Sequence, residues 1–275
     1  MTTQRFEKMF AALKEKNEGA FVAFVNLCDP TEEMSLEILE TLTAAGVDAL
    51  ELGIPFSDPC ADGPVIMQSA KRALDAGAGT AKCMNVIEKF RDRHPDMPIS
   101  IMIYANLVFA PGIENFFAMC AASGVDTVLI PDLPLEMREM DPSFDNAAKA
   151  HGIGLVAIAP PNARRDHLPI LARASAGYVY LLSRPGITGA NNPAHMPAEE
   201  LIDALKKANA APGLLGFGVS TCEHVRHALQ CGASGVIVGS AIVRIINEYL
   251  DEPETMKAQI TDYVRTMKAA TRAAS

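Results

Sequence analysis

Positive charge is scarce in this chain. Lys and Arg number 24 against 33 Asp and Glu, which leaves a formal net charge of −9. The sequence also contains no basic run. Proteins that bind nucleic acid or an anionic membrane need a basic surface, so the composition argues against both partners. An anionic substrate would have to be held by backbone amides or by a few local cations.

Long apolar runs are missing as well. No segment is apolar for the length of a membrane span, and the N-terminus lacks the apolar stretch of a signal peptide. The six cysteines form no CxxC pair and no secretory framework. A reducing cytoplasm with free thiols is therefore the expected compartment.

The residues that are present predict an α/β fold. Hydrophobic residues make up 49% of the 275 residues, enough for the core of one large domain. Strand-like runs alternate with helical periodicity, and several helices end at a glycine turn such as Ala45-Gly46-Val47. The runs are residues 21–27, 49–54, 99–105, 127–133, 154–160, 178–183, 214–219 and 235–240. Eight such units predict a (β/α)₈ TIM barrel, a single domain over residues 1–275.

Additional helices are predicted outside the repeating units. They cover residues 65–76 and 80–93 between the second and third strands, 5–15 at the start and 254–270 at the end. We expect them to plug the bottom of the barrel or to cover its ends. The alternative architecture, an open doubly wound sheet, would need a Gly-rich phosphate loop after its first strand, and Leu27-Cys28-Asp29-Pro30 is not one.

Two carboxylates, Glu51 and Asp62, stand out between the second strand and the next helix. Glu51 lies near the carboxyl end of the strand, where barrel enzymes carry their chemistry, and Asp62 lies on the following loop. A desolvated carboxylate has a raised pKa and can give or take a proton near neutral pH. Read separately, Glu51 could hydrogen-bond a neighbouring strand and Asp62 could cap the helix that begins at Pro64.

Glycine signals follow the last three strands and predict a phosphate site. They are Gly186-Ile-Thr-Gly189, Gly216-Phe217-Gly218 within strand seven, and Gly239-Ser240 before a helix. Loops after strands seven and eight often bind phosphate together with a helix N-terminus. The stretch 184–197 is long and rich in Gly, Pro and Asn, and predicts a lid over the substrate.

Groups that would support other chemistry are missing. No lysine falls in a strand run, which argues against a Schiff-base lysine at the barrel mouth. His224 and His227 are spaced for one helix face, on a helix expected outside the barrel without carboxylates nearby. The sequence therefore predicts proton chemistry with no metal and no cofactor.

These motifs resemble the tryptophan synthase alpha chain family along nearly the whole chain. The most specific is Glu51-Leu-Gly-Ile-Pro-Phe-Ser-Asp-Pro-Cys-Ala-Asp62-Gly-Pro. The others are Tyr104-Ala-Asn, Pro131-Asp132-Leu-Pro, Tyr180-Leu-Leu-Ser-Arg-Pro-Gly-Ile-Thr-Gly and Gly216-Phe-Gly-Val-Ser. The resemblance implies a lyase of tryptophan biosynthesis that cleaves indole-3-glycerol phosphate into indole and glyceraldehyde 3-phosphate.

The resemblance also implies roles for individual residues. Glu51 is expected to shuttle protons, Asp62 to accept the indole N–H, and Tyr180 to be an active-site tyrosine. The substrate-binding residues are expected to be Phe24, Met102, Leu129 and Ile237 around the indole, and Thr188, Gly189, Phe217, Gly218, Gly239 and Ser240 around the phosphate. The family works with a pyridoxal-phosphate-dependent beta chain, so an α₂β₂ heterotetramer is expected, with the pyridoxal phosphate only in the partner.

Three departures and three alternatives remain. Cys28 stands where the family often has glycine, Cys60 replaces a larger apolar residue, and Pro185 stands where alanine is common. None of these touches a proposed catalytic atom. The alternatives are a different barrel enzyme that acts on a phosphorylated aromatic precursor, a stand-alone lyase that releases free indole, and a non-catalytic barrel that acts only as a partner protein.

Overall fold

Nine parallel strands form one closed sheet in the computed structural model, which describes residues 3–182 and 199–272. The strands are β1 (Ala20–Asn26), β2 (Ala49–Gly53), β3 (Ile99–Met102), β4 (Thr127–Leu129), β5 (Gly154–Leu155), β6 (Ala157–Ala159), β7 (Val179–Leu182), β8 (Gly213–Gly216) and β9 (Gly235–Val238). Their order is β5-β4-β3-β2-β1-β9-β8-β7-β6. Since β5 and β6 follow one another in the chain, this order closes on itself, and the predicted barrel is confirmed.

The strand predicted over residues 154–160 is divided in two, so that nine strands occupy the eight predicted positions of the barrel. β5 pairs with β4, whereas β6 pairs with β7. Between them, the backbone N–H of Ala157 donates to the Ser175 hydroxyl at 3.1 Å. The Ser175 side chain thus provides the acceptor that a backbone carbonyl of a ladder would otherwise provide. β5 and β6 are two parts of one barrel strand, with β4 on one side and β7 on the other, and regular pairing is interrupted at Val156.

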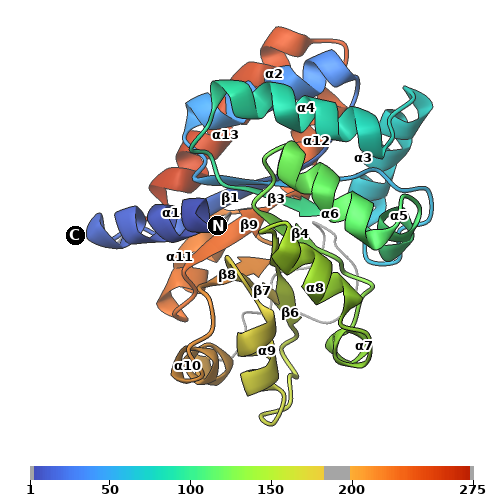
Figure 1. Cartoon of the computed structure of the whole chain (residues 1–275). Helices are drawn as coiled ribbons and strands as arrows, with labels where there is room; N and C mark the ends of the chain where they lie inside the picture. The colour runs from blue at the N-terminus through green and yellow to red at the C-terminus, as the bar shows by residue number, and fades with distance from the viewer. Residues whose placement is uncertain (1–2, 183–198, 273–275) are drawn as a thin grey trace.

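Helices surround the barrel (Figure 1). Within the described residues they are α1 (Gln4–Glu15), α2 (Glu32–Ala45), α3 (Pro64–Asp75), α4 (Thr80–Arg93), α5 (Ala105–Phe109), α6 (Ile113–Ala122), α7 (Leu135–Met140), α8 (Ser143–Ala150), α9 (Leu168–Ala174), α10 (Glu199–Lys207), α11 (Cys222–Gln230), α12 (Ser240–Glu248) and α13 (Pro253–Ala269). The four additional helices are confirmed as α1, α3, α4 and α13. No helix in the described ranges is long and apolar enough to cross a membrane.

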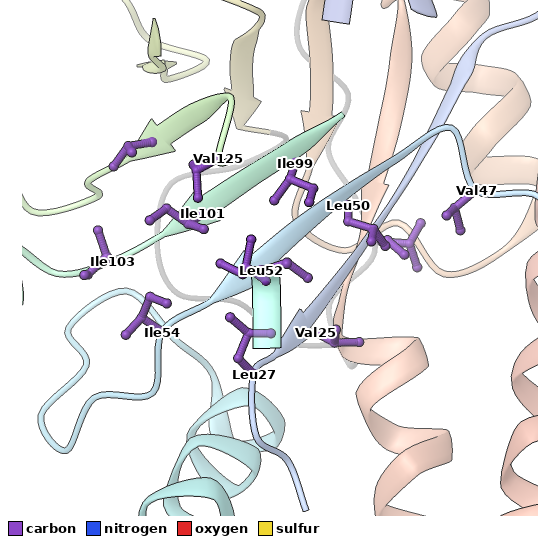
Figure 2. Packing of buried hydrophobic residues seen from close by; sticks show 14 of the residues in the cluster. Val25, Leu27, Val47, Leu50, Leu52, Ile54, Ile99, Ile101, Ile103 and Val125 are labelled. Atoms are coloured by element: carbon purple, nitrogen blue, oxygen red, sulfur yellow. The ribbon is translucent and has the colours of Figure 1, made fainter. Parts of the chain in front are cut away.

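Side chains alternate strictly between the two faces of the barrel. Figure 2 shows the outer face, where Leu50 and Leu52 of β2 pack with Ile99 and Ile101 of β3. Odd and even positions point to opposite faces of a strand, so Glu51, between Leu50 and Leu52, must face the interior. The inner cluster accordingly collects the other parity: Ala20, Val22 and Phe24 of β1, with Leu129, Tyr180, Leu214 and Ile237.

The N-terminal helix α1 closes the amino end of the barrel. Phe6 is fully buried and joins the inner cluster together with Leu13. Its ring lies 5.4 Å from that of Tyr178, centroid to centroid. This agrees with the expectation that an added helix plugs the barrel bottom. Near the carboxyl end of the described residues, Arg272 pairs with Glu18, which follows α1.

Candidate active site

A cavity of about 420 Å³ opens at the carboxyl ends of the strands. Its lining includes every predicted site residue that the structure describes: Phe24, Glu51, Asp62, Met102, Leu129, Tyr180, Phe217, Gly218, Ile237, Gly239 and Ser240. These residues come from different strands or the loops that follow them, so closure of the barrel brings them together. Thr188, Gly189 and the predicted lid at 184–197 lie outside the described residues.

Glu51 is almost fully buried, with 1% of its surface exposed. The hydroxyl of Tyr178 donates to Glu51 Oε1 at 2.6 Å. Burial raises the pKa of Glu51 to about 7, and the hydrogen bond from Tyr178 only partly opposes this. The carboxyl can therefore exchange a proton near neutral pH. Within the described residues the hydrogen-bond partner of Glu51 is this phenol, which directly precedes β7, and not a group of the adjacent strands β1 and β3.

Tyr178 and Ser100 are site residues that sequence reasoning missed. Ser100 is paired with Glu51 across β2 and β3, and its Oγ lies 2.9 Å from the Tyr178 hydroxyl. All three are buried. Parity offered a signal, since Tyr178 precedes Tyr180 by two positions and so shares its inward face. The sequence alone could not show that its hydroxyl reaches a strand 127 residues away.

Asp62 lies on the loop between β2 and α3 and is 7% exposed. Tyr104 donates its hydroxyl to Asp62 Oδ2 at 2.9 Å and accepts the backbone N–H of Ala61 at 3.1 Å. Burial raises the pKa of Asp62, and the bond from Tyr104 opposes the shift. Within the described residues no side chain caps α3, so the alternative role of Asp62 as a helix cap is wrong. The motif Tyr104-Ala-Asn does not by itself indicate that Tyr104 holds this loop, because the contact exists only in the folded chain.

Tyr180 projects from β7 into the inner cluster, where burial raises its pKa. Its ring meets Phe217 edge to face, with centroids 6.1 Å apart. Gly216 makes room for it, because a Cβ atom at this position would collide with the Tyr180 hydroxyl. Gly216, the last residue of β8 and the first of the Gly216-Phe217-Gly218 signal, therefore also has a packing role.

The apolar wall of the cavity is formed by Phe24, Met102, Leu129 and Ile237. Three of them are buried members of the inner cluster, and Met102 packs against it partly exposed. They come from β1, β3, β4 and β9, so the wall extends around much of the barrel mouth. The carboxylates Glu51 and Asp62 line the same cavity, and a mostly apolar lining with a smaller number of polar groups is typical of a small-molecule site.

The cavity is also lined by Phe217, Gly218, Gly239 and Ser240, which follow β8 and β9. β8 ends at Gly216, so Phe217 and Gly218 follow the strand instead of lying within it, which corrects the predicted boundary at residue 219. Both adopt positive φ angles, 63° and 74°. Ser240 begins α12, as predicted, and no side chain in the described part of the chain caps this helix. Its first N–H groups and its dipole suit an anion.

Cys28, one of the departures, adopts a positive φ of 62°. Such a backbone favours glycine, which agrees physically with the expectation of glycine that the family resemblance gave for this position. The Cys28 N–H donates to Ser35 Oγ at 3.0 Å, a contact that helps to hold this conformation. Cys60 is exposed on the Asp62 loop. Pro185 lies outside the described residues.

The histidines predicted to lie outside the barrel do so, on α11. His224 Nδ1 accepts the backbone N–H of Ser220 at 3.3 Å, and His227 lies 3.8 Å from Cys231 Sγ. Across residues 3–182 and 199–272, no three His, Cys, Asp or Glu side chains are grouped so that they could hold a metal ion.

We expect Tyr178→Phe to raise the pKa of Glu51 above about 7, because the variant loses the hydrogen bond that stabilises the carboxylate. A ¹³C NMR titration of glutamate-labelled protein would measure the shift. Tyr180→Phe is the matched control, since among the described residues the Tyr180 hydroxyl makes no hydrogen bond to Glu51. An unchanged Glu51 pKa in folded Tyr178→Phe would contradict this account.

Known proteins resemble this chain along nearly its whole length. A family model described as tryptophan synthase alpha chain matches residues 10–272. The tryptophan synthase alpha chain of Klebsiella pneumoniae is 51% identical over 271 residues, which are 98% of this chain and 100% of that protein. A chain of Mycobacterium tuberculosis tryptophan synthase superimposes with a TM-score of 0.85 at 27% identity, covering 98% of this chain and 99% of that one. A chain of the Pyrococcus furiosus tryptophan synthase a2b2 complex does so with a TM-score of 0.79 at 34% identity, covering 92% and 99%. The chain belongs to the tryptophan synthase alpha chain family.

Proposed function

We propose that this chain is a carbon–carbon lyase of tryptophan biosynthesis that cleaves indole-3-glycerol phosphate to indole and glyceraldehyde 3-phosphate. The observation that carries the proposal is one cavity in which two buried carboxylates with raised pKa values face an apolar wall and the N-terminus of α12. The substrate has matching parts: an N–H and a ring carbon that need proton chemistry, an apolar indole and a phosphate.

The cleavage breaks the bond between the indole ring carbon and the glycerol chain. The ring carbon gains a proton, and the glycerol hydroxyl loses one as its carbon becomes a carbonyl, so the protons balance. In this proposal Glu51 gives the first proton and takes the second, a task for which a pKa near 7 is suited. Asp62 accepts the indole N–H and stabilises the positive charge that develops on the ring.

The remaining residues position the substrate in this proposal. Phe24, Met102, Leu129 and Ile237 bind the indole ring, and Tyr180 with Phe217 forms the wall beside it. Gly218, Gly239 and Ser240 bind the phosphate through backbone N–H groups at the start of α12. Thr188 and Gly189 are proposed to complete the phosphate site. No cofactor takes part in these steps.

A direct assay tests the proposed activity. The purified chain is mixed with indole-3-glycerol phosphate, and released indole is measured by fluorescence or extraction. Release of indole that depends on the chain supports the lyase. If a folded sample releases none, with or without a tryptophan synthase beta chain, the non-catalytic barrel or a barrel enzyme for another phosphorylated substrate becomes the better proposal.

We expect Gly218→Asp to raise the KM for indole-3-glycerol phosphate sharply, because it places a carboxylate where the phosphate is proposed to bind. Gly218→Asn is the matched control: Asn has the same shape, tolerates the observed φ of 74° and carries no charge. Steady-state kinetics of both variants would separate charge from backbone strain. An unchanged KM in folded Gly218→Asp would move the phosphate site elsewhere.

A second chain is part of the proposed function. The Pyrococcus furiosus structure is of an a2b2 complex described for its mutual activation. We propose the same α₂β₂ assembly here, in the cytoplasm, with pyridoxal phosphate only in the beta chain. The docking surface we propose is the catalytic face, around Pro30, residues 55–59 and residues 131–134; Asp29 of the Asp29-Pro30 turn is itself buried. Phe109 and Met137 add exposed apolar surface there, 52% and 54% exposed, on helices that follow β3 and β4.

We expect a beta chain to raise the rate of indole release by at least ~10-fold, since docking beside the Asp62 loop would favour the closed, productive site. Assays with and without the beta chain, together with gel filtration, measure the effect. Phe109→Asp should weaken the complex and leave the basal rate of the isolated chain intact. Equal rates with no complex would leave the stand-alone lyase as the better interpretation.

A further inference from the structure

A buried polar network joins the end of β1 and the loop after it to α3 and α12, close to the cavity. It comprises Asn26, Asp29, Ser69, Arg72 and Asn247, which we call the Asp29 network. Asn26, Asp29 and Ser69 are at most 4% exposed, which is unusual for groups that prefer water. Buried polar groups are kept only when their hydrogen bonds are satisfied, and here they satisfy one another.

Arg72, on α3, is the centre of this network. Its Nε and Nη2 donate to the two carboxylate oxygens of Asp29, each at 2.9 Å, in a bidentate pair. Its remaining nitrogen, Nη1, donates to Asn247 Oδ1 on α12 at 2.7 Å. The planar guanidinium therefore joins α3 to α12 and to the loop after β1, with a bidentate geometry that lysine could not reproduce.

The network continues from Asp29 to the first turns of α3. Ser69 donates to Asp29 Oδ2 at 2.5 Å and accepts from Asn26 Nδ2 at 3.0 Å. The same Asn26 nitrogen donates to the backbone carbonyl of Ile66 at 3.1 Å. The first two turns of α3 are thus hydrogen-bonded to β1. Hydrogen bonds require a defined geometry, whereas apolar packing alone would allow α3 to shift along the strand.

The two helices that Arg72 joins both begin at the cavity. α3 begins at Pro64, two residues after Asp62, and α12 begins at Ser240. Asp62 and Ser240 both line the cavity, as do Ile66 and Ala241 in the first turns. The relative position of α3 and α12 therefore sets the separation between the proposed indole N–H acceptor and the proposed phosphate site.

We propose that Arg72 is a positioning residue that holds the indole and phosphate subsites at the separation which one substrate molecule spans. This inference rests on the proposed function, since it takes the indole to lie near Asp62 and the phosphate near Ser240. Arg72 touches neither group; it acts through Asp29 and Asn247. Loss of the Arg72 hydrogen bonds would leave each subsite intact but would change the distance between the two.

Three probes test the proposal by calorimetry on the full chain. Indole reports one subsite, glycerol 3-phosphate reports the other, and indole-3-propanol phosphate joins both by a saturated chain that cannot be cleaved. The product of the two fragment Kd values divided by the Kd of the joined ligand measures the advantage of joining. We expect Arg72→Lys and Asn247→Ala to lower this ratio by about tenfold while each fragment Kd stays within about twofold of wild type.

The controls separate positioning from simple stability. Lys71→Ala changes the adjacent, exposed residue of α3, which pairs only with Asp75 among the described residues, and should leave the ratio unchanged. Asn247→Ala keeps the Asp29–Arg72 pair, so it should fold even where Arg72→Lys does not. A lower Tm with an unchanged ratio in Asn247→Ala would overturn the inference and leave the proposed function standing. A folded wild-type chain that binds none of the three probes would overturn both.

Discussion

Glu51→Gln is expected to lower the rate of indole release by at least ~10²–10⁴-fold, the usual cost of losing an essential general acid or base. Glu51 is the carboxyl whose burial raises its pKa to about 7, and an amide of the same shape cannot exchange a proton. Turnover of indole-3-glycerol phosphate with the beta chain present would measure the loss. Near-normal turnover would show that another group moves the protons.

The same variant also has a predicted pH-dependent effect on the free energy of unfolding, which tests the raised pKa of Glu51. The pKa of Glu51 rises from 4.5 to about 7 on folding, so its contribution to stability is present in full below pH 4.5 and is lost as pH rises through 7. The loss amounts to about 3 kcal/mol above pH 7. The amide of Glu51→Gln does not titrate. In urea unfolding, the free energy of unfolding of the variant should therefore rise relative to that of wild type between about pH 5 and pH 8. A flat difference across this range would mean that the Glu51 pKa is not raised.

Asp62→Asn is expected to lower kcat by ~10²–10³-fold, because an amide cannot supply the negative charge that stabilises a cationic indole ring. Tyr104 can still donate to the side-chain oxygen of Asn, so the loop should keep its position. Binding of indole-3-propanol phosphate is accordingly expected to change less than kcat. The two quantities, measured on one preparation, distinguish lost charge from a displaced loop.

A matched control comes from the same loop. Asp58→Asn removes a charge four residues earlier, at an exposed position where the carboxylate contacts Ser57. We expect its turnover in the isolated chain to remain near that of wild type. If Asp62→Asn and Asp58→Asn lowered turnover equally, Asp62 would contribute only a negative charge to the loop. Its proposed role at the indole N–H would then be wrong.

Much of the architecture could be predicted because it depends on local patterns. Leu50 and Leu52 flank Glu51, so a period of two already directs the carboxylate to the barrel interior. Gly46, predicted to end a helix, has a positive φ angle, as do Gly124 and Gly232 after α6 and α11. Pro64 and Ser240 begin helices close to where their sequence signals placed them. Each of these features is decided within a few residues of the chain.

The partners of the proposed catalytic groups could not be predicted in this way. Tyr178 reaches Glu51 across 127 positions, and Arg72 reaches Asn247 across 175. The break at Val156 and the early end of β8 depend on which strands become neighbours. Hydrogen bonds of this kind exist only once the sheet has closed.

Sequence thus determined which residues face the interior of the barrel, since parity along a strand is a local property. The tertiary structure decided what those residues meet. It buries Glu51 against Tyr178 and Asp62 against Tyr104, and burial in a low-dielectric surrounding is what raises both pKa values. Desolvation depends on everything that closes around a group, so no pattern within the strand can encode it.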